Sequence, residues 1–142
     1  MLIVDTGPVL AQLKPQEAKA RAAARILTAE RSVPVLPLPV AAELDSMLNA
    51  RGGARANSQL LKDLAAGRFI VPGLEAGDFM TAAALNEQYR DLDVGLTDLS
   101  IIIIAARFRT TRILTFDQRH FRAMRPLQGG VFTLLPYDEP LT

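Results

Sequence analysis

The sequence opens with MLIVDTGPVLA (Met1–Ala11), in which four apolar residues lead directly into a charged one, Asp5. An uninterrupted apolar run of this length is typical of a strand buried on both faces, as in a parallel sheet. Burying a carboxylate costs free energy unless the group is paired or bound. We therefore predict that residues 1–4 form a core strand and that Asp5, at its end, belongs to a binding site.

The composition indicates one globular domain spanning residues 1–142, with 49% hydrophobic residues and a net charge of +1. The absence of cysteine excludes disulfides, thiolate catalysis and cysteine metal sites. The N-terminus has no basic leader typical of a signal peptide, and the longest aliphatic run, Ile101–Ile104, is too short to cross a bilayer. We expect a cytoplasmic protein without membrane contact.

Strand and helix signals alternate along the chain. After the first strand, further strands are predicted at residues 33–38, 69–71, 112–116 and 131–135, and helices at residues 17–30, 39–49, 54–66, 78–89 and 97–107. Ile101–Ile104 favours a strand by propensity, but Thr97 as N-cap and Asp98 in the first turn indicate a helix. The alternation predicts an α/β three-layer sandwich, with a roughly five-stranded parallel sheet flanked by helices.

Four carboxylates are predicted to meet at one edge of this sheet. Ligands of open parallel sheets bind beyond the carboxyl ends of the strands, and Asp5 and Asp117 each follow a predicted strand. Asp98 begins a helix that should start at that edge. Glu43 lies early in the helix after the second strand, bordering its apolar face. Each acid alone is also explained as a turn former, helix cap or helix-dipole partner, but those explanations do not predict convergence.

A cluster of four carboxylates needs a counter-charge, because like charges raise one another's pKa values. Without cysteine, oxygen ligation favours a hard divalent cation, Mg²⁺ or alternatively Mn²⁺. Thr6 and Thr115 flank two of the acids, and we predict that their hydroxyls orient a carboxylate or a bound water. His120 follows Asp117 closely, but is interpreted here as a surface histidine.

At these residues the sequence resembles the PIN-domain family of metal-dependent ribonucleases, particularly the VapC toxins of toxin–antitoxin pairs. The resemblance covers essentially the whole chain and is carried by four motifs in order: IVDTGPVLA (Ile3–Ala11), PVAAELDSML (Pro39–Leu48), GLTDLSIIIIAA (Gly95–Ala106) and ILTFDQRHF (Ile113–Phe121). It departs from the family at Leu99, where a small residue is usual.

The resemblance implies that Asp5, Glu43, Asp98 and Asp117 form the catalytic and metal-binding site, with Asp5 and Asp98 as direct Mg²⁺ ligands. It also implies RNA as substrate, a homodimer, and a VapB-like antitoxin that obstructs the site. Bound cations would activate water for hydrolysis of an RNA phosphodiester. Arginines predicted to hold the RNA backbone, or else to be solvated surface charges, are Arg51, Arg55, Arg107, Arg109, Arg112 and Arg119.

Other functions remain open at this point. A receiver-type phosphate-accepting domain would need a paired acid cluster after the first strand and a late lysine, and the sequence has neither. A phosphatase of the haloacid dehalogenase type would have a second aspartate where Gly7 stands. A PIN nuclease that processes RNA without being a toxin, or a catalytically silent PIN-like scaffold, are the remaining alternatives.

Overall fold

The computed structural model describes residues 1–139. Its sheet contains β1 (Ile3–Val4), β2 (Arg112–Leu114) and β3 (Thr133–Leu135), all parallel and in the order β1-β2-β3. Single bridges continue the parallel pairing from Ile3 to Val35 and from Val35 to Ile70. The α/β fold with a parallel sheet is thus confirmed, and five segments contribute to the pairing.

The predicted strands at residues 33–38 and 69–71 are shorter than expected. Each is reduced to a single bridge residue, Val35 and Ile70 respectively. Proline has no N–H to donate to a sheet, and Pro34 and Pro37 flank the bridge at Val35. The remaining groups still pair with both neighbouring segments: the Val35 N–H donates to the Leu2 carbonyl at 2.8 Å, and the Pro34 carbonyl accepts the Ile70 N–H at 2.9 Å.

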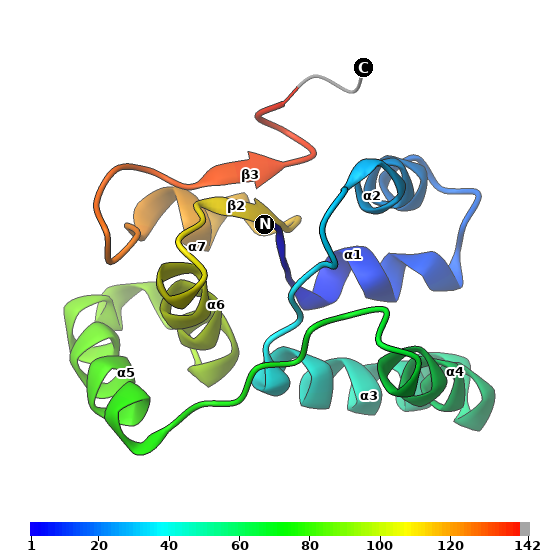
Figure 1. Cartoon of the computed structure of the whole chain (residues 1–142), viewed down its shortest axis with the longest axis horizontal. Coiled ribbons are helices and arrows are strands. Elements are labelled where there is room, and N and C mark those ends of the chain that lie inside the picture. Colours follow the sequence, from blue (N-terminus) through cyan, green and yellow to red (C-terminus); the bar gives the residue numbers. More distant parts are fainter. Residues whose placement is uncertain (140–142) are drawn as a thin grey trace.

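Helices surround the sheet in sequence-adjacent pairs: α1 packs on α2, α3 on α4, and α5 on α6 (Figure 1). Their bounds are α1 Thr6–Leu10, α2 Ala18–Ala29, α3 Leu38–Gly52, α4 Ala54–Ala65, α5 Ala76–Gln88, α6 Leu96–Arg107 and α7 Gln118–Ala123. Short 3-10 turns lie at η1 (Ala11–Leu13) and η2 (Arg90–Leu92). Among residues 1–139, no helix is long and apolar enough to span a membrane.

Helices α1 and α7 are not among the predicted helices, and each begins directly after a predicted site acid. The Asp5 carboxylate accepts a hydrogen bond from the Thr6 N–H at 2.8 Å, and the Asp117 carboxylate accepts one from the His120 N–H at 3.0 Å. Both acids therefore act as helix caps. Capping fixes the direction in which each carboxylate leaves its strand.

Helix α6 carries the apolar run Ile101–Ile104, and its helical prediction is confirmed. Every residue from Leu99 to Ala105 is buried, so the helix is enclosed by protein on nearly all sides. The helix packs against β1, α3 and α5. Its N-cap is Gly95 and not Thr97 as predicted. Asp98 therefore lies in the first turn of a helix whose central residues are buried.

The sheet brings two of the predicted acids into proximity. Strands β1 and β2 are hydrogen-bonded neighbours that run in the same direction, with Val4 opposite Leu114. The Asp5 N–H continues this ladder by donating to the Leu114 carbonyl at 2.9 Å. Asp5 and the turn that contains Asp117 consequently leave the same edge of the sheet.

Candidate metal centre

The four predicted carboxylates line one pocket of about 500 Å³ beyond the carboxyl ends of β1 and β2. Asp5 follows β1, Glu43 comes from α3, Asp98 from the first turn of α6, and Asp117 from the turn between β2 and α7. Thr6, Gly7, Leu10, Met47 and Phe116 complete its lining. Segments far apart in the sequence thus converge as the sheet-edge argument requires.

Asp5 is the most enclosed of the four acids, with 8% of its surface exposed. The Thr115 hydroxyl donates to Asp5 Oδ2 at 2.7 Å and also accepts the Asp117 N–H at 2.9 Å. A single hydroxyl therefore connects the carboxylate of one acid with the backbone of another. Because Thr115 is completely buried, its hydrogen bond to Asp5 is shielded from water.

Glu43 reaches the pocket from an otherwise exposed position on α3. The Thr6 hydroxyl donates to Glu43 Oε2 at 2.7 Å, which holds the carboxylate against the start of α1. Thr6 and Thr115 thus each donate to one of the predicted acids. Hydroxyl donors of this kind orient carboxylates in metal sites.

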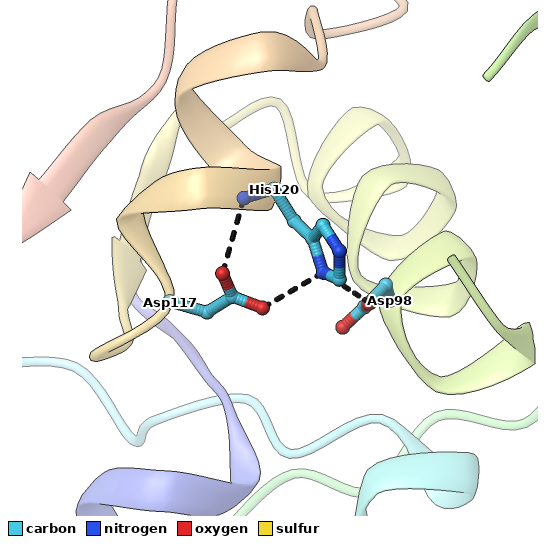
Figure 2. A group of neighbouring side chains, drawn as sticks. All are labelled: Asp98, Asp117 and His120. Carbon is cyan, nitrogen blue, oxygen red and sulfur yellow. Dashed lines mark hydrogen bonds and ion pairs between the residues drawn. The ribbon is translucent and has the colours of Figure 1, made fainter. Parts of the chain in front are cut away.

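Asp98, Asp117 and His120 form a compact group at the α6–α7 side of the pocket (Figure 2). His120 Nδ1 lies 3.1 Å from Asp98 Oδ2 and 2.8 Å from Asp117 Oδ2. The interpretation of His120 as a surface histidine is wrong, because only 18% of its side chain is exposed and the ring faces both carboxylates. The spacing of three residues from Asp117 could have indicated this, since such residues share one face of a helix.

The pocket raises the pKa values of its enclosed acids. Burial raises the pKa of Asp5, and the nearby Asp117 and Glu43 carboxylates add to that increase. Burial and the charge of Asp5 raise the pKa of Asp98 to about 6, against the opposing effect of His120. These shifts have the signs expected for carboxylates that share a desolvated space without a counter-charge.

The donor set fits a divalent cation. Carboxylate oxygens and an imidazole nitrogen are ligands for divalent cations, and one ligand atom each from Asp98, Asp117 and His120 lie within 4.8 Å of one another. A cation would also supply the missing positive charge beside Asp5 and Asp98. The site therefore has the composition and the electrostatic requirement of a divalent metal centre.

The raised pKa of Asp98 predicts that the metal-free protein becomes more stable on mild acidification. A carboxyl that holds its proton more tightly when folded contributes stability that is fully present below about pH 4 and lost as pH rises through about 6. Denaturation in chelator should give a higher free energy of unfolding at about pH 5 than at about pH 7. Asp98→Asn should reduce this gain in the free energy of unfolding between about pH 7 and about pH 5. An unchanged gain in the variant would contradict the assignment to Asp98.

A close backbone approach shapes the pocket wall. A Cβ atom built on Gly7 would lie 3.3 Å from Cδ2 of Phe116, tighter than ordinary packing. Glycine therefore lets α1 lie directly against the Phe116 ring, which follows β2. Gly7 and Phe116 both line the acidic pocket, so this contact forms part of its wall.

The arginines predicted to contact RNA occupy different environments. Arg107 pairs with Asp78, and Arg112 pairs with Glu30 at 2.8 Å and with Glu139 at 3.3 Å. Arg51 lines a second pocket, of about 540 Å³, that shares Gly7, Leu10 and Phe116 with the acidic one. The remaining three are Arg55, which lines an apolar groove between helices, Arg109, which has a positive φ, and Arg119, which is exposed on α7.

This second pocket contains positive charges that the sequence pattern did not single out. Lys14 and Lys19 line it together with Arg51, and the Lys19 ammonium lies 5.4 Å from the centre of the Phe116 ring. Their only sequence signal is proximity to the first motif. A pocket lined by three cationic side chains, one acid (Glu17) and an aromatic ring therefore adjoins the four carboxylates, and is called the cationic pocket below.

A parallel α/β sheet with four carboxylates at its carboxyl edge, carried by the four sequence motifs above, defines a PIN-domain protein. Ribonuclease VapC26 of Mycobacterium tuberculosis is 34% identical to the chain over 135 residues, covering 95% of the chain and 100% of that protein. The chain belongs to the VapC family of PIN-domain ribonucleases. No protein-family model matches the sequence.

Two solved structures share the fold. The crystal structure of M. tuberculosis VapC20, described as a sarcin–ricin loop cleaving toxin, has a TM-score of 0.78 at 18% identity, over 87% of the chain and 95% of VapC20. A toxin–antitoxin complex from Klebsiella pneumoniae has a TM-score of 0.64 at 18% identity, over 87% of the chain and 92% of its counterpart. At this identity both similarities concern the fold.

Proposed function

We propose that the protein is a divalent-metal-dependent endoribonuclease and the toxin of a toxin–antitoxin pair, with residues 1–142 as a single nuclease domain. The observation that carries the proposal is the convergence of Asp5, Glu43, Asp98 and Asp117 in one pocket of a chain 34% identical to a ribonuclease. Such a pocket serves hydrolysis of a phosphodiester, a reaction that needs a counter-charge for the phosphate and an activated water.

The proposed cofactor is Mg²⁺, with Mn²⁺ as the alternative. When bound, the cation supplies positive charge against the scissile phosphate and lowers the pKa of the attacking water. Asp5 and Asp98 are the proposed direct ligands, since burial and neighbouring carboxylates raise the pKa values of both, so that both need a counter-charge. Glu43 and Asp117 complete the acidic shell and orient water.

The threonine hydroxyls fix the geometry of these carboxylates. Thr115 holds Asp5 and the backbone of Asp117, and Thr6 holds Glu43. Pre-oriented carboxylates require less rearrangement when substrate arrives. The proposed reaction needs no side-chain nucleophile, because water is the attacking group.

The cationic pocket beside the acids suits the RNA backbone. Lys14, Lys19 and Arg51 would neutralise phosphates next to the scissile one, and the Phe116 wall lies between the two pockets. Such contacts position RNA without reading its sequence. That Arg55, Arg109 and Arg119 contact more distant phosphates of the RNA stays a prediction. Arg107 and Arg112 already neutralise acidic partners.

The proposed partners are a VapB-like antitoxin and a second copy of the chain, in the cytoplasm. The fold similarity to a chain of a toxin–antitoxin complex supports the first. Large apolar side chains at the surface support protein contacts in general. The most exposed on α5 are Phe79 and Met80, with 50% and 77% of their surfaces accessible.

The proposal is tested by mapping RNA 5′ ends after incubation of RNA with the purified protein. We expect new 5′ ends at defined positions with Mg²⁺ or Mn²⁺ and none with EDTA. Asp98→Ala should abolish them, because Asp98 is a proposed cation ligand. Cleavage that persists in EDTA or in the variant would contradict a metal-dependent site.

The positions of the cleavage sites separate the remaining alternatives. A toxin is expected to cut an RNA that translation requires and to arrest growth when induced without its antitoxin. A processing nuclease would cut precursor RNAs without arresting growth. A silent scaffold would produce no new 5′ ends with either cation.

A further inference from the structure

His120 is held in place from outside the acidic pocket. Its Nε2 atom lies 2.9 Å from the Leu92 carbonyl oxygen in η2. A carbonyl oxygen only accepts hydrogen bonds, so Nε2 carries a proton and donates it. This bond fixes the ring orientation and directs the other nitrogen, Nδ1, toward Asp98 and Asp117 (Figure 2).

The Nδ1 atom itself lacks a satisfactory partner. It is buried, and among residues 1–139 it makes no hydrogen bond of acceptable geometry. Its nearest charged neighbours are the Oδ2 atoms of Asp98 and Asp117, and Nδ1 forms a hydrogen bond with neither. A buried polar atom that stands beside two carboxylates without a hydrogen bond requires a missing ion, water or proton.

The distances match the first coordination shell of a small cation. An octahedral cation with ligands at about 2.1 Å places adjacent ligands about 3.0 Å apart and opposite ligands about 4.2 Å apart. Nδ1 lies 2.8 Å and 3.1 Å from the two Oδ2 atoms, and all three ligand atoms lie within 4.8 Å of one another. The histidine also has the carbonyl-bound second nitrogen that is typical of metal-ligating imidazoles.

We propose that His120 Nδ1 is a direct ligand of the divalent cation, together with Asp98 and Asp117, and that this nitrogen makes the site select Mn²⁺ over Mg²⁺. This inference replaces the water-orienting role of Asp117 proposed above by direct ligation and favours the alternative cation, Mn²⁺. Imidazole binds first-row transition ions more readily than Mg²⁺, which favours oxygen ligands alone. The inference rests on the proposed function for the biological use of the cation. The nitrogen ligand is decided by a spectroscopic measurement that needs no RNA.

The decisive experiment is pulsed electron paramagnetic resonance of Mn²⁺ added to the full chain. His120 is the only histidine, so ¹⁵N-histidine labelling of protein made without a histidine tag reports on one imidazole. We expect a strong nitrogen coupling that changes with the isotope, and the same signal in the exposed-surface control Arg125→Gln. Bound Mn²⁺ without directly coordinated nitrogen would overturn the proposal and would identify His120 as a charged partner of the two aspartates.

Two substitutions separate ligation from the Leu92 hydrogen bond. His120→Gln can keep a donor for the Leu92 carbonyl but has no nitrogen ligand, and His120→Asn shortens the side chain while keeping an amide near the Nδ1 position. By calorimetric titration, both should lose at least about 10-fold in Mn²⁺ affinity but less than about 3-fold in Mg²⁺ affinity. Equal losses for the two ions, or none, would count against a nitrogen ligand.

The outcome is separable from that of the proposed function. RNA cleavage without nitrogen coupling would retain the nuclease and remove His120 from the ligand set. Nitrogen coupling without RNA cleavage would retain the metal centre and reject the nuclease. Because the coupling is measured on the unmodified chain, the result does not depend on how well the His120 variants fold.

Discussion

Replacing Asp5 by asparagine should reduce RNA cleavage by about 10³-fold or more while leaving the metal-free protein at least as stable as the parent. Loss of a cation-holding carboxylate removes several kcal/mol of charge stabilisation from the transition state, and each 1.4 kcal/mol corresponds to about tenfold in rate. Cleavage rates at saturating Mg²⁺ and chemical denaturation in chelator measure the two effects.

The stability of the Asp5→Asn protein follows from the charges around Asp5. Burial and two neighbouring carboxylates raise the pKa of this acid, so its charged form is unfavourable in the folded protein without a cation. An amide of the same shape carries no charge and can still accept the Thr6 N–H hydrogen bond through its oxygen. Its nitrogen can donate to the Thr115 hydroxyl oxygen, so the contact that Thr115 makes with Asp5 is kept with its direction reversed. Unchanged cleavage would contradict the role of Asp5, and a large loss of stability would contradict the electrostatic argument.

Thr115→Val should destabilise the protein by about 2 kcal/mol, because a buried carboxylate and a partly buried backbone N–H lose their partner. The Asp5 carboxylate loses a donor and the Asp117 N–H loses its acceptor, whereas valine has nearly the same shape as threonine. Cleavage should fall about 10-fold to 100-fold, as is usual when a hydrogen-bond partner of a metal-binding carboxylate is removed. Denaturant unfolding and initial cleavage rates measure the two losses.

Thr115→Ser is the matched control, because serine keeps the hydroxyl and removes only a methyl group. Its cleavage rate should stay within a few-fold of the parent. If valine at this position left both stability and cleavage unchanged, the hydroxyl would have no role in holding Asp5. If serine and valine were equally impaired, packing and not hydrogen bonding would explain the effect.

The placement of the four carboxylates could be predicted because it depends on topology. Once the apolar run at Met1–Val4 is a parallel strand, Asp5 must emerge at its carboxyl end, and the same holds for Asp117 after β2. The polarity of helices relative to strands then places Glu43 and Asp98 at that edge. None of these steps requires knowledge of a side-chain conformation.

The elements that were missed depend on local contacts that sequence periodicity does not encode. Helices α1 and α7 are five and six residues long, too short to show a repeating apolar pattern. His120 depends on a tertiary hydrogen bond to Leu92, 28 residues earlier in the chain. The reduction of a predicted strand to one bridge at Val35 depends on which N–H groups face the neighbouring strand.

Arg112 illustrates a different limitation of reading charges along the sequence. It begins β2, whereas the acidic turn with Asp117 follows the end of β2, so strand direction separates them. Its guanidinium joins Glu30, at the end of α2, to Glu139. Whether a residue begins or ends a strand is therefore as informative about its distance from the acidic pocket as its proximity in sequence to a site residue.

The contacts at the beginning of the parallel strands have a practical consequence for attaching probes to the molecule. Glu139 is held at the start of β2, and the Met1 carbonyl, just ahead of β1, accepts a hydrogen bond from Thr110 at 2.8 Å. Both lie where the parallel strands begin, opposite the carboxylates. A fluorophore or surface tether joined at either place would leave the acidic opening turned toward bulk solution, so single-molecule measurements with long RNAs can use both attachment points.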